Sequence, residues 1–163
     1  MNMATADRVA RARACAAAIP DPEIPVVSLA ELGILRAVRE EAGRVVVELT
    51  PTYTGCPATE VIAEDVRRAL AEAGEPDAEV RTVLSPPWTT DWISEEGRRK
   101  LRDYGIAPPA PVAAGAQAHV HLVRCPRCNA ARVERLSTYG STPCKALWRC
   151  LACREPFDAF KPY

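Results

Sequence analysis

Two cysteine pairs near the C-terminus constrain the fold more than any other feature of this chain. Cys125 and Cys128 form one C-x₂-C knuckle, and Cys150 and Cys153 form a second one after 21 intervening residues. Each knuckle can direct two thiolates at one metal ion about 2.3 Å away, so two knuckles supply a closed tetrahedral site. A tail of roughly 40 residues has too small an apolar core to fold without such a staple. The spacing therefore predicts a structural zinc ribbon.

The ligands of this ribbon leave alternatives open. Four thiolates also accept iron, as in rubredoxin-like sites, and the same cysteines could stay reduced or pair as disulfides. Cys144 adds a fifth sulfur to a site that needs four, either as a spectator or as a participant in metal transfer. His119 and His121 alternate along a strand-like run and would share one face, but a four-cysteine site needs neither of them.

The chain contains seven cysteines and no long apolar stretch. No segment reaches the roughly 20 apolar residues that span a bilayer. Residues 1–18 are interrupted by charges, so they do not resemble a secretory signal. We therefore expect a cytoplasmic protein without a membrane partner. Its cysteines are expected to serve metal or thiol chemistry rather than disulfides.

The formal net charge is zero, but the charges are unevenly distributed. Residues 1–118 carry a formal charge of −5 and residues 119–163 one of +5. A basic tail can contact nucleic acid. However, a Zn²⁺ ion with four thiolates would contribute about −2 and offset much of the excess. A nucleic-acid binder is therefore the weaker interpretation, and we expect no nucleic-acid partner.

The N-terminal two-thirds have the pattern of a small α+β domain. Residues 5–18 are rich in Ala and Arg and predict a helix. Residues 34–38 and 45–49 are β-prone runs around a Glu-Glu-Ala-Gly turn, which predicts a hairpin. Residues 58–73 predict an amphipathic helix and residues 79–84 a third strand. We therefore expect a β-β-α-β core with a small mixed sheet, preceded by a helix.

The composition changes over residues 108–118, which are rich in Pro, Ala and Gly and read as a linker. The predicted organisation is an α+β domain over residues 1–107, this linker, and a ribbon domain over residues 119–163. Before the linker, a helix is predicted to begin at Ser94 and to end at Gly105. The β-prone runs of the tail are residues 119–123, 133–137 and 147–149.

Cys56 is the candidate reactive position of the first domain. It lies between a predicted strand and a predicted helix, in the run Thr-Gly-Cys-Pro. Because Pro57 fits the first helical position, we expect Cys56 to be the N-cap, where free N–H groups favour a thiolate. No histidine lies outside the tail, so a Cys–His dyad and a nucleophilic enzyme are not expected. A transient metal ligand and a buried structural thiol remain, and the buried role is also expected of Cys15.

Two proline-stiffened segments carry further candidates. Three prolines in residues 20–25 give a rigid loop that holds Asp21 and Glu23 in fixed positions, although sequence alone does not place it relative to Cys56. Thr50 supplies a hydroxyl next to the predicted strand. The second segment contains Trp88, Asp91 and Trp92, which we interpret as a partner surface.

Several of these segments resemble known families. The run Asp21-Pro-Glu-Ile-Pro-Val-Val-Ser-Leu-Ala-Glu-Leu-Gly-Ile34 and the pair Leu49-Thr50 with Thr54-Gly-Cys-Pro57 resemble two motifs of the metal–sulfur cluster assembly family that includes the SufT-type proteins. Trp88-Thr-Thr-Asp-Trp92, Gly105-Ile-Ala-Pro-Pro109 and the four-cysteine tail together resemble the PaaD-type component of the bacterial phenylacetyl-CoA epoxidase system. The resemblance covers residues 16–163 without a departure at the motif positions.

The resemblance implies an accessory subunit of the phenylacetyl-CoA epoxidase system in phenylacetate degradation, and not an enzyme. Such a subunit would assist assembly or repair of a metal centre, with the iron–sulfur reductase as client and other oxygenase subunits as partners. Asp21, Glu23, Thr50 and Cys56 carry over as a site for transient Fe or Fe–S. The alternative is an adaptor that holds oxygenase subunits together through the ribbon and residues 88–92. A homo-oligomer is compatible with both.

Overall fold

A computed structural model describes residues 3–111 and 122–163 and divides the chain into two compact units, Met1–Trp88 and Thr89–Tyr163. This division falls earlier in the chain than the predicted linker. Strand β4 (Ile106–Ala107) pairs in parallel with strand β7 (Pro156–Phe160), which assigns β4 to the second unit. Most of the predicted linker, together with His119 and His121, lies outside the described residues.

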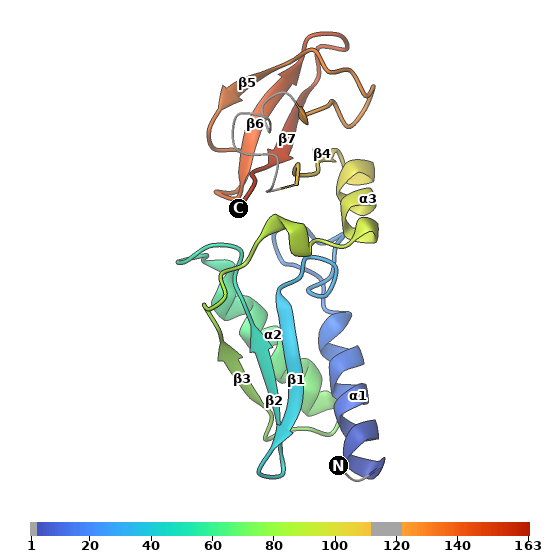
Figure 1. Ribbon diagram of the computed structural model, residues 1–163, viewed down its shortest axis with the longest axis vertical. Coiled ribbons are helices and arrows are strands. Elements are labelled where there is room, and N and C mark those ends of the chain that lie inside the picture. Colours follow the sequence, from blue (N-terminus) through green and yellow to red (C-terminus); the bar gives the residue numbers. More distant parts are fainter. Residues whose placement is uncertain (1–2, 112–121) are drawn as a thin grey trace. The chain divides into compact units, whose positions relative to one another are not determined.

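The first unit is an α+β layer, as expected (Figure 1). Strands β1 (Leu35–Glu41) and β2 (Arg44–Leu49) form the predicted antiparallel hairpin. Strand β3 (Glu79–Thr82) pairs in parallel with β2, and helix α2 (Ala58–Glu72) makes the crossover between them. Helix α1 (Met3–Ala17) precedes the hairpin and packs against β1 and α2. The resulting sheet order is β1-β2-β3.

The core of this unit follows the two periodicities in the sequence. Val45, Val47 and Leu49 of β2 share one face and are buried, and Val46 on the other face is buried as well. Helix α2 buries Ile62 and Leu70 at helical spacing. Further buried residues are Ala12, Ala16 and Val66. Burial of a side chain such as Leu70 contributes about 1.5–3 kcal/mol.

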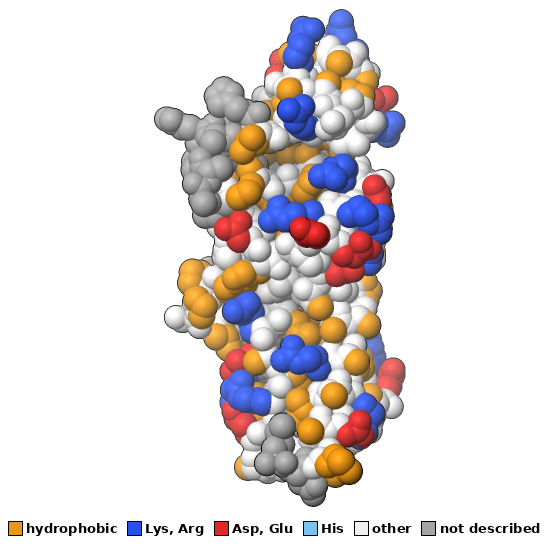
Figure 2. Space-filling view, turned by 45° about the vertical axis from the view of Figure 1, so that its right-hand side comes forward, with side chains coloured by type: hydrophobic (Ala, Val, Ile, Leu, Met, Phe, Trp, Pro, Cys, Tyr) orange, Lys and Arg blue, Asp and Glu red, His pale blue; other side chains and the backbone are white. Residues whose placement is uncertain are grey.

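The opposite face of the sheet carries alternating charges. Arg39 donates hydrogen bonds to Glu41 and Glu48, both at 2.6 Å. Arg81 donates to Glu79 at 2.6 Å and to Glu41 at 2.8 Å. The hydrogen bonds from Arg39 and then Arg81 lower the pKa of the Glu41 carboxyl. These side chains are more than a third exposed apart from Glu48, so each pair adds little stability. Basic and acidic side chains are likewise interspersed on the face drawn in Figure 2.

Arg8 joins three elements of the first unit. Its guanidinium donates to both carboxylate oxygens of Glu75, at 2.7 and 2.5 Å, and to the carbonyl of Gly43 at 2.9 Å. Helix α1 is thereby tied to the loop after α2 and to the hairpin turn. The Glu75 side chain is only 12% exposed. The hydrogen bonds from Arg8 hold the pKa of the Glu75 carboxyl below its usual value, against the opposing effect of burial.

Glu75→Gln is expected to lower the free energy of unfolding of the first unit at pH 7 by about 1 kcal/mol, because Arg8 is partly solvated. A depressed folded-state pKa stabilises the fold fully above the unfolded-state value of about 4.3, and this contribution is lost as the pH falls through the folded-state pKa. Urea unfolding between pH 7 and pH 3 should show this loss in the parent chain and not in the variant. The control Glu64→Gln removes an exposed pair with Arg67 and should change stability by less than about 0.5 kcal/mol. Equal effects of the two substitutions would contradict the assignment.

Within its described residues, the second unit contains an α-helix, the short helix η1 (Thr90–Trp92) and a four-stranded sheet of order β4-β7-β6-β5. Helix α3 (Glu95–Tyr104) begins and ends as predicted: the Ser94 hydroxyl accepts from the N–H of Gly97 at 3.0 Å, and Gly105 is left-handed with φ 95°. Strands β5 (Val133–Ser137) and β6 (Lys145–Cys150) match two predicted β-prone runs. Strands β4 and β7 were not predicted. No helix within the described residues is long and apolar enough to cross a membrane.

Hydrogen bonds join the first residues of the second unit, Thr89 and Thr90, to Tyr163 and form a clasp. The backbone N–H of Thr90 and the hydroxyl of Thr89 donate to the carbonyl of Tyr163, at 3.1 and 2.8 Å. The N–H of Tyr163 donates in turn to the Thr90 hydroxyl at 3.5 Å. This clasp is buried at Thr90, whereas the hydrogen bond from the Thr89 hydroxyl is exposed.

Candidate functional site

The fold of the second unit brings the four knuckle cysteines together. All four Sγ atoms lie within 4.8 Å of one another. The Sγ atoms of Cys125 and Cys153 are 3.7 Å apart, and those of Cys128 and Cys150 are 3.5 Å apart. A tetrahedron with metal–sulfur bonds of about 2.3 Å has edges of about 3.8 Å. The thiols are free, and their spacing fits the corners of such a site.

The two knuckles have the same backbone conformation and the same backbone hydrogen bond. The N–H of Asn129 donates to the carbonyl of Cys125 at 2.9 Å, and that of Arg154 to the carbonyl of Cys150 at 3.0 Å. Asn129 and Arg154 are both left-handed, with φ of 60° and 68°. This conformation reverses the chain immediately after each C-x₂-C pair and directs both sulfurs inward. The N–H of Cys153 also faces the Sγ of Cys150, at 3.5 Å.

The pKa values of two of these closely spaced thiols, Cys150 and Cys153, shift in opposite directions. Hydrogen bonding from the N–H of Cys153, the largest effect, lowers the pKa of the Cys150 thiol to about 6. The pKa of the Cys153 thiol rises to about 12, because burial and the neighbouring thiols outweigh the N–H of Glu155, which acts in the opposite direction. Four thiolates so close together repel one another unless a metal ion compensates their charge. The donor set therefore fits a four-coordinate metal.

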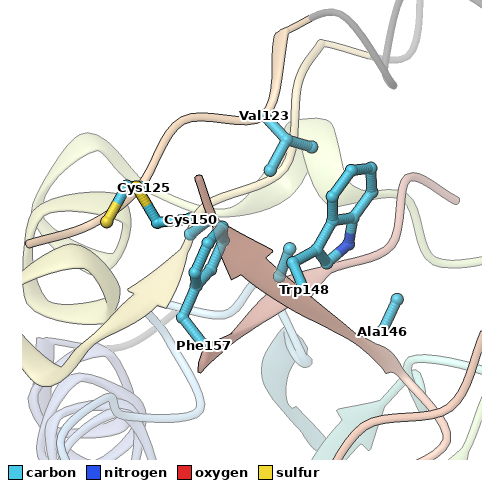
Figure 3. Packing of buried hydrophobic residues seen from close by; sticks show 8 residues of the cluster. Val123, Cys125, Ala146, Trp148, Cys150 and Phe157 are labelled. Atoms are coloured by element: carbon cyan, nitrogen blue, oxygen red, sulfur yellow. The ribbon is translucent and has the colours of Figure 1, made fainter. Parts of the chain in front are cut away.

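An apolar core supports the knuckles from within the sheet. Cys125 and Cys150 are buried, and they pack in one cluster with Trp148 of β6 and Phe157 of β7. Trp148 and Phe157 are cross-strand partners, so their side chains share a face. Figure 3 shows the Phe157 ring beside the two buried cysteines. The ribbon thus has a small core that depends on two of its own ligands.

Cys144 lies outside the group of four. It is buried, and its Sγ is 3.0 Å from the hydroxyl of Thr142. The four knuckle sulfurs complete a tetrahedral set without it. This arrangement favours the spectator role.

Cys56 is a free, half-buried thiol at the start of helix α2. The expected N-cap is wrong by one residue: the cap is Pro57, which has helical angles and offers no side-chain hydrogen bond. The N–H of Thr59 bonds to the carbonyl of Cys56 at 3.1 Å, a tight first turn of the three-residue type. Gly55, exposed and with φ 86°, makes the sharp bend before the cysteine. Cys56 therefore lies on a bent loop that leads into the helix.

The other candidate residues of the first unit, Asp21, Glu23 and Thr50, mainly stabilise the local fold. Asp21 is buried, and its Oδ1 accepts from the N–H groups of Glu23 and Ile24 at 2.9 and 2.8 Å, which fixes the proline-rich loop. Glu23 is half-buried. Thr50 is 2% exposed, and its hydroxyl has no hydrogen-bond partner among the described residues. Within residues 3–111 and 122–163, the tail cysteines are the one group of three or more potential metal ligands, so Cys56 is not preassembled with Asp21 and Glu23.

The predicted partner surface is wrong at Trp88. This indole is 5% exposed, and its Nε1 donates to the carbonyl of Leu32 at 2.9 Å within the first unit. A proline-flanked tryptophan is equally compatible with either location on sequence grounds, and here a backbone acceptor made burial favourable. Asp91 is exposed and Trp92 half-buried, both in the short helix η1 (Thr90–Trp92).

Comparison with known families assigns the two parts of the chain to two different family models. Residues 13–83 match the family model for an iron–sulfur cluster assembly protein, and residues 109–161 match that for the PaaD zinc beta ribbon domain. The first match contains Cys56, and the second contains all four knuckle cysteines.

Individual relatives show the same two parts. The chain is 49% identical over 146 residues to a protein of Escherichia coli K12 described as the putative D component of 1,2-phenylacetyl-CoA epoxidase, covering 88% of this chain and 86% of that protein. It is 38% identical over 85 residues to the Fe-S protein maturation auxiliary factor YitW of Bacillus subtilis 168, covering 51% of this chain and 82% of YitW.

A solved structure supports the assignment of the first unit. The crystal structure of a DUF59 domain from Bacillus anthracis matches 61% of this chain and 95% of that domain, with a TM-score of 0.55 and 29% identity. Since the identity to the Escherichia coli protein extends over both parts of the chain, the protein belongs to the PaaD family of phenylacetyl-CoA epoxidase components, in which a SufT-like domain precedes a zinc ribbon.

Proposed function

We propose that the chain is a non-catalytic accessory subunit that assists assembly or repair of an iron–sulfur or other metal centre in a phenylacetyl-CoA oxygenase complex. In this proposal the iron–sulfur reductase is the client, and the work takes place in the cytoplasm, where thiols stay reduced. Zinc holds the ribbon permanently, whereas Cys56 binds the transferred metal or cluster for a short time. The observation that carries the proposal is a free, half-buried thiol on a bent loop of the cluster-assembly domain.

The surroundings of Cys56 suit transient binding. Gly55 and Thr54 are exposed beside it, so an approaching protein can reach the loop. Cys56 supplies one sulfur, whereas a tetrahedral thiolate site needs four ligands. A metal at Cys56 would therefore complete its coordination with ligands from the client, which makes departure to the client easy. The buried hydroxyl of Thr50 and the fixed loop of Asp21 are proposed to shape this region rather than to hold the metal.

The adaptor alternative loses part of its basis. It relied on the ribbon and on residues 88–92 as contact surfaces, but Trp88 of that segment is buried. Asp91 and Trp92 remain candidates for contact with another subunit. Adaptor and assembly factor differ in their dependence on Cys56, because only the second needs its sulfur.

Cys56→Ser is expected to lower cluster occupancy of the reductase made in the same cells by about tenfold, since losing a ligand should cost at least as much as losing a ligand's supporting contact. Occupancy is measured from iron and sulfide per purified reductase and from its visible spectrum. The matched control is Cys15→Ser. Cys15 is also a half-buried thiol of the first unit, but its Sγ lies 3.4 Å from the carbonyl of Ala69 between α1 and α2. The proposal would be contradicted by unchanged cluster occupancy with Cys56→Ser, or by an equal loss of occupancy with both variants.

A further inference from the structure

A pocket of about 260 Å³ lies inside the second unit, between helix α3 and the first cysteine knuckle. Arg98, Arg102 and Arg124 line it, and no carboxylate is among its lining residues. Its walls are otherwise mostly apolar, with Leu122 and the prolines 108, 109, 111 and 126. A cavity with this lining is electropositive.

Arg98 is fixed in place by neutral acceptors, and among the described residues Asp91 is the one acidic group whose charge acts on it. Its guanidinium donates to the carbonyls of Pro109 at 2.6 Å, Thr90 at 2.7 Å and Ile93 at 3.3 Å. Carbonyl groups satisfy the donors but carry no net charge. Burial lowers the pKa of Arg98, against the charge of Asp91, which raises it. The site thus holds a half-buried cation in a rigid position, with further N–H donors available.

The other two arginines add charge from opposite walls. Arg102 follows Arg98 by one helical turn and therefore lies on the same side of α3. Arg124 precedes the first knuckle and donates to the carbonyl of Asn129 at 3.3 Å. Both are exposed, and neither has an ion pair within the described residues. Arg99 of the same helix differs, because it forms ion pairs with Glu96 and Asp103. Arg99 does not line the pocket, whereas Arg102, which has no such ion pair in the part of the chain that the structure describes, does.

We propose that the pocket formed by Arg98, Arg102 and Arg124 binds a small molecule that carries a phosphate or diphosphate group. One carboxylate cannot compensate three guanidinium groups, whereas a phosphate carries about −1.5 to −2 charges at pH 7. The planar fork of arginine matches phosphate oxygens in bidentate fashion. The proline and leucine walls accept an apolar or planar remainder of the ligand. The site is separate from Cys56 and does not depend on its proposed role.

Isothermal titration of the metal-loaded full chain at constant ionic strength tests this site, with inorganic pyrophosphate and ADP as probes. Saturable binding is expected for pyrophosphate, and Arg102→Gln and Arg124→Gln should each raise its Kd about tenfold. The matched control is Arg127→Gln, because Arg127 is an exposed arginine of the same knuckle that does not line the pocket. If ADP binds more tightly than pyrophosphate, the ligand is an organic phosphate. If ADP and pyrophosphate bind equally tightly, the ligand is the free anion. Both results support the site.

Three results would overturn the proposal. The first is the absence of saturable binding at millimolar pyrophosphate. The second is an equal loss with Arg127→Gln, which would indicate general attraction to a basic surface. The third is displacement of pyrophosphate by a hexaglutamate peptide at equal concentration, which would assign the pocket to an acidic protein segment. Retained metal content and circular dichroism in each variant establish that a loss of binding is not a loss of fold.

Discussion

Cys125→Ser is expected to release the metal from the ribbon and to unfold the second unit. Cys125 is both a ligand candidate and a core residue, because it packs with Trp148 and Phe157. Structural zinc contributes about 10–16 kcal/mol of apparent binding free energy in zinc fingers at pH 7, far more than a core this small can replace. Elemental analysis should give about one zinc per parent chain and none in the variant. Amide hydrogen exchange should show loss of protection in β5, β6 and β7 and intact protection in the first unit.

Two substitutions serve as controls for this result. Cys144→Ala removes a buried thiol from the same unit without touching the group of four, so zinc should be retained. Cys56→Ser alters a thiol of the first unit and should also leave the zinc content unchanged. Zinc retained in Cys125→Ser, or iron instead of zinc in the parent chain, would contradict the assignment of the ribbon.

Asp158→Ala is expected to destabilise the second unit by about 3 kcal/mol, because it leaves a buried lysine without its counterion. Lys145 is 3% exposed, and its Nζ lies 3.6 Å from Oδ2 of Asp158. The hydroxyl of Ser141 also donates to this carboxylate, at 2.6 Å. Gly140 lies against the same group so closely that a Cβ there would meet Oδ1 at 2.3 Å. The carboxylate therefore holds both the lysine and the turn before β6.

Hydrogen exchange of the β6 and β7 amides measures this loss within the metal-loaded chain. The matched control is Glu134→Gln, which removes an ion pair with Arg149 in the same sheet where both side chains are at least 40% exposed. That change should cost less than about 1 kcal/mol. The double substitution Asp158→Ala with Lys145→Met should recover much of the stability, because it removes the unpaired charge together with its partner. No recovery would show that the loss comes from the Ser141 contact instead.

The parts of the fold that sequence predicted are those fixed by local patterns. Helix α2, the β1–β2 hairpin and helix α3 each have a periodicity or a cap within the element itself. Strand β4 has only two residues and exists because Ile106 and Ala107 pair with β7. No local pattern can show such a strand. Strand β7 did have a signal, since Phe157 and Ala159 alternate with Asp158, but Pro156 at its start weakened it.

The candidate site likewise has parts that local sequence patterns predict and parts that depend on contacts between distant segments. The spacing of the knuckles was sufficient to group four cysteines, because each C-x₂-C pair builds its own turn. The surroundings of Cys56 and the burial of Trp88 depend on contacts between distant segments, such as the one from Trp88 to Leu32. The arginine pocket was not found from sequence for the same reason. Arg98 and Arg124 are 26 positions apart in the numbering, and only the fold places them around one cavity.

The clasp between Tyr163 and residues 89–90 has a practical consequence for protein engineering. A fragment cut at the proline-rich stretch near residue 108 would leave the hydrogen-bond donors of Thr89 and Thr90 behind and expose the carbonyl that they bind. A fragment that begins at Thr89 keeps both sides. Because the two ends of this unit touch, they could also be joined by a short peptide and the chain reopened at an exposed turn.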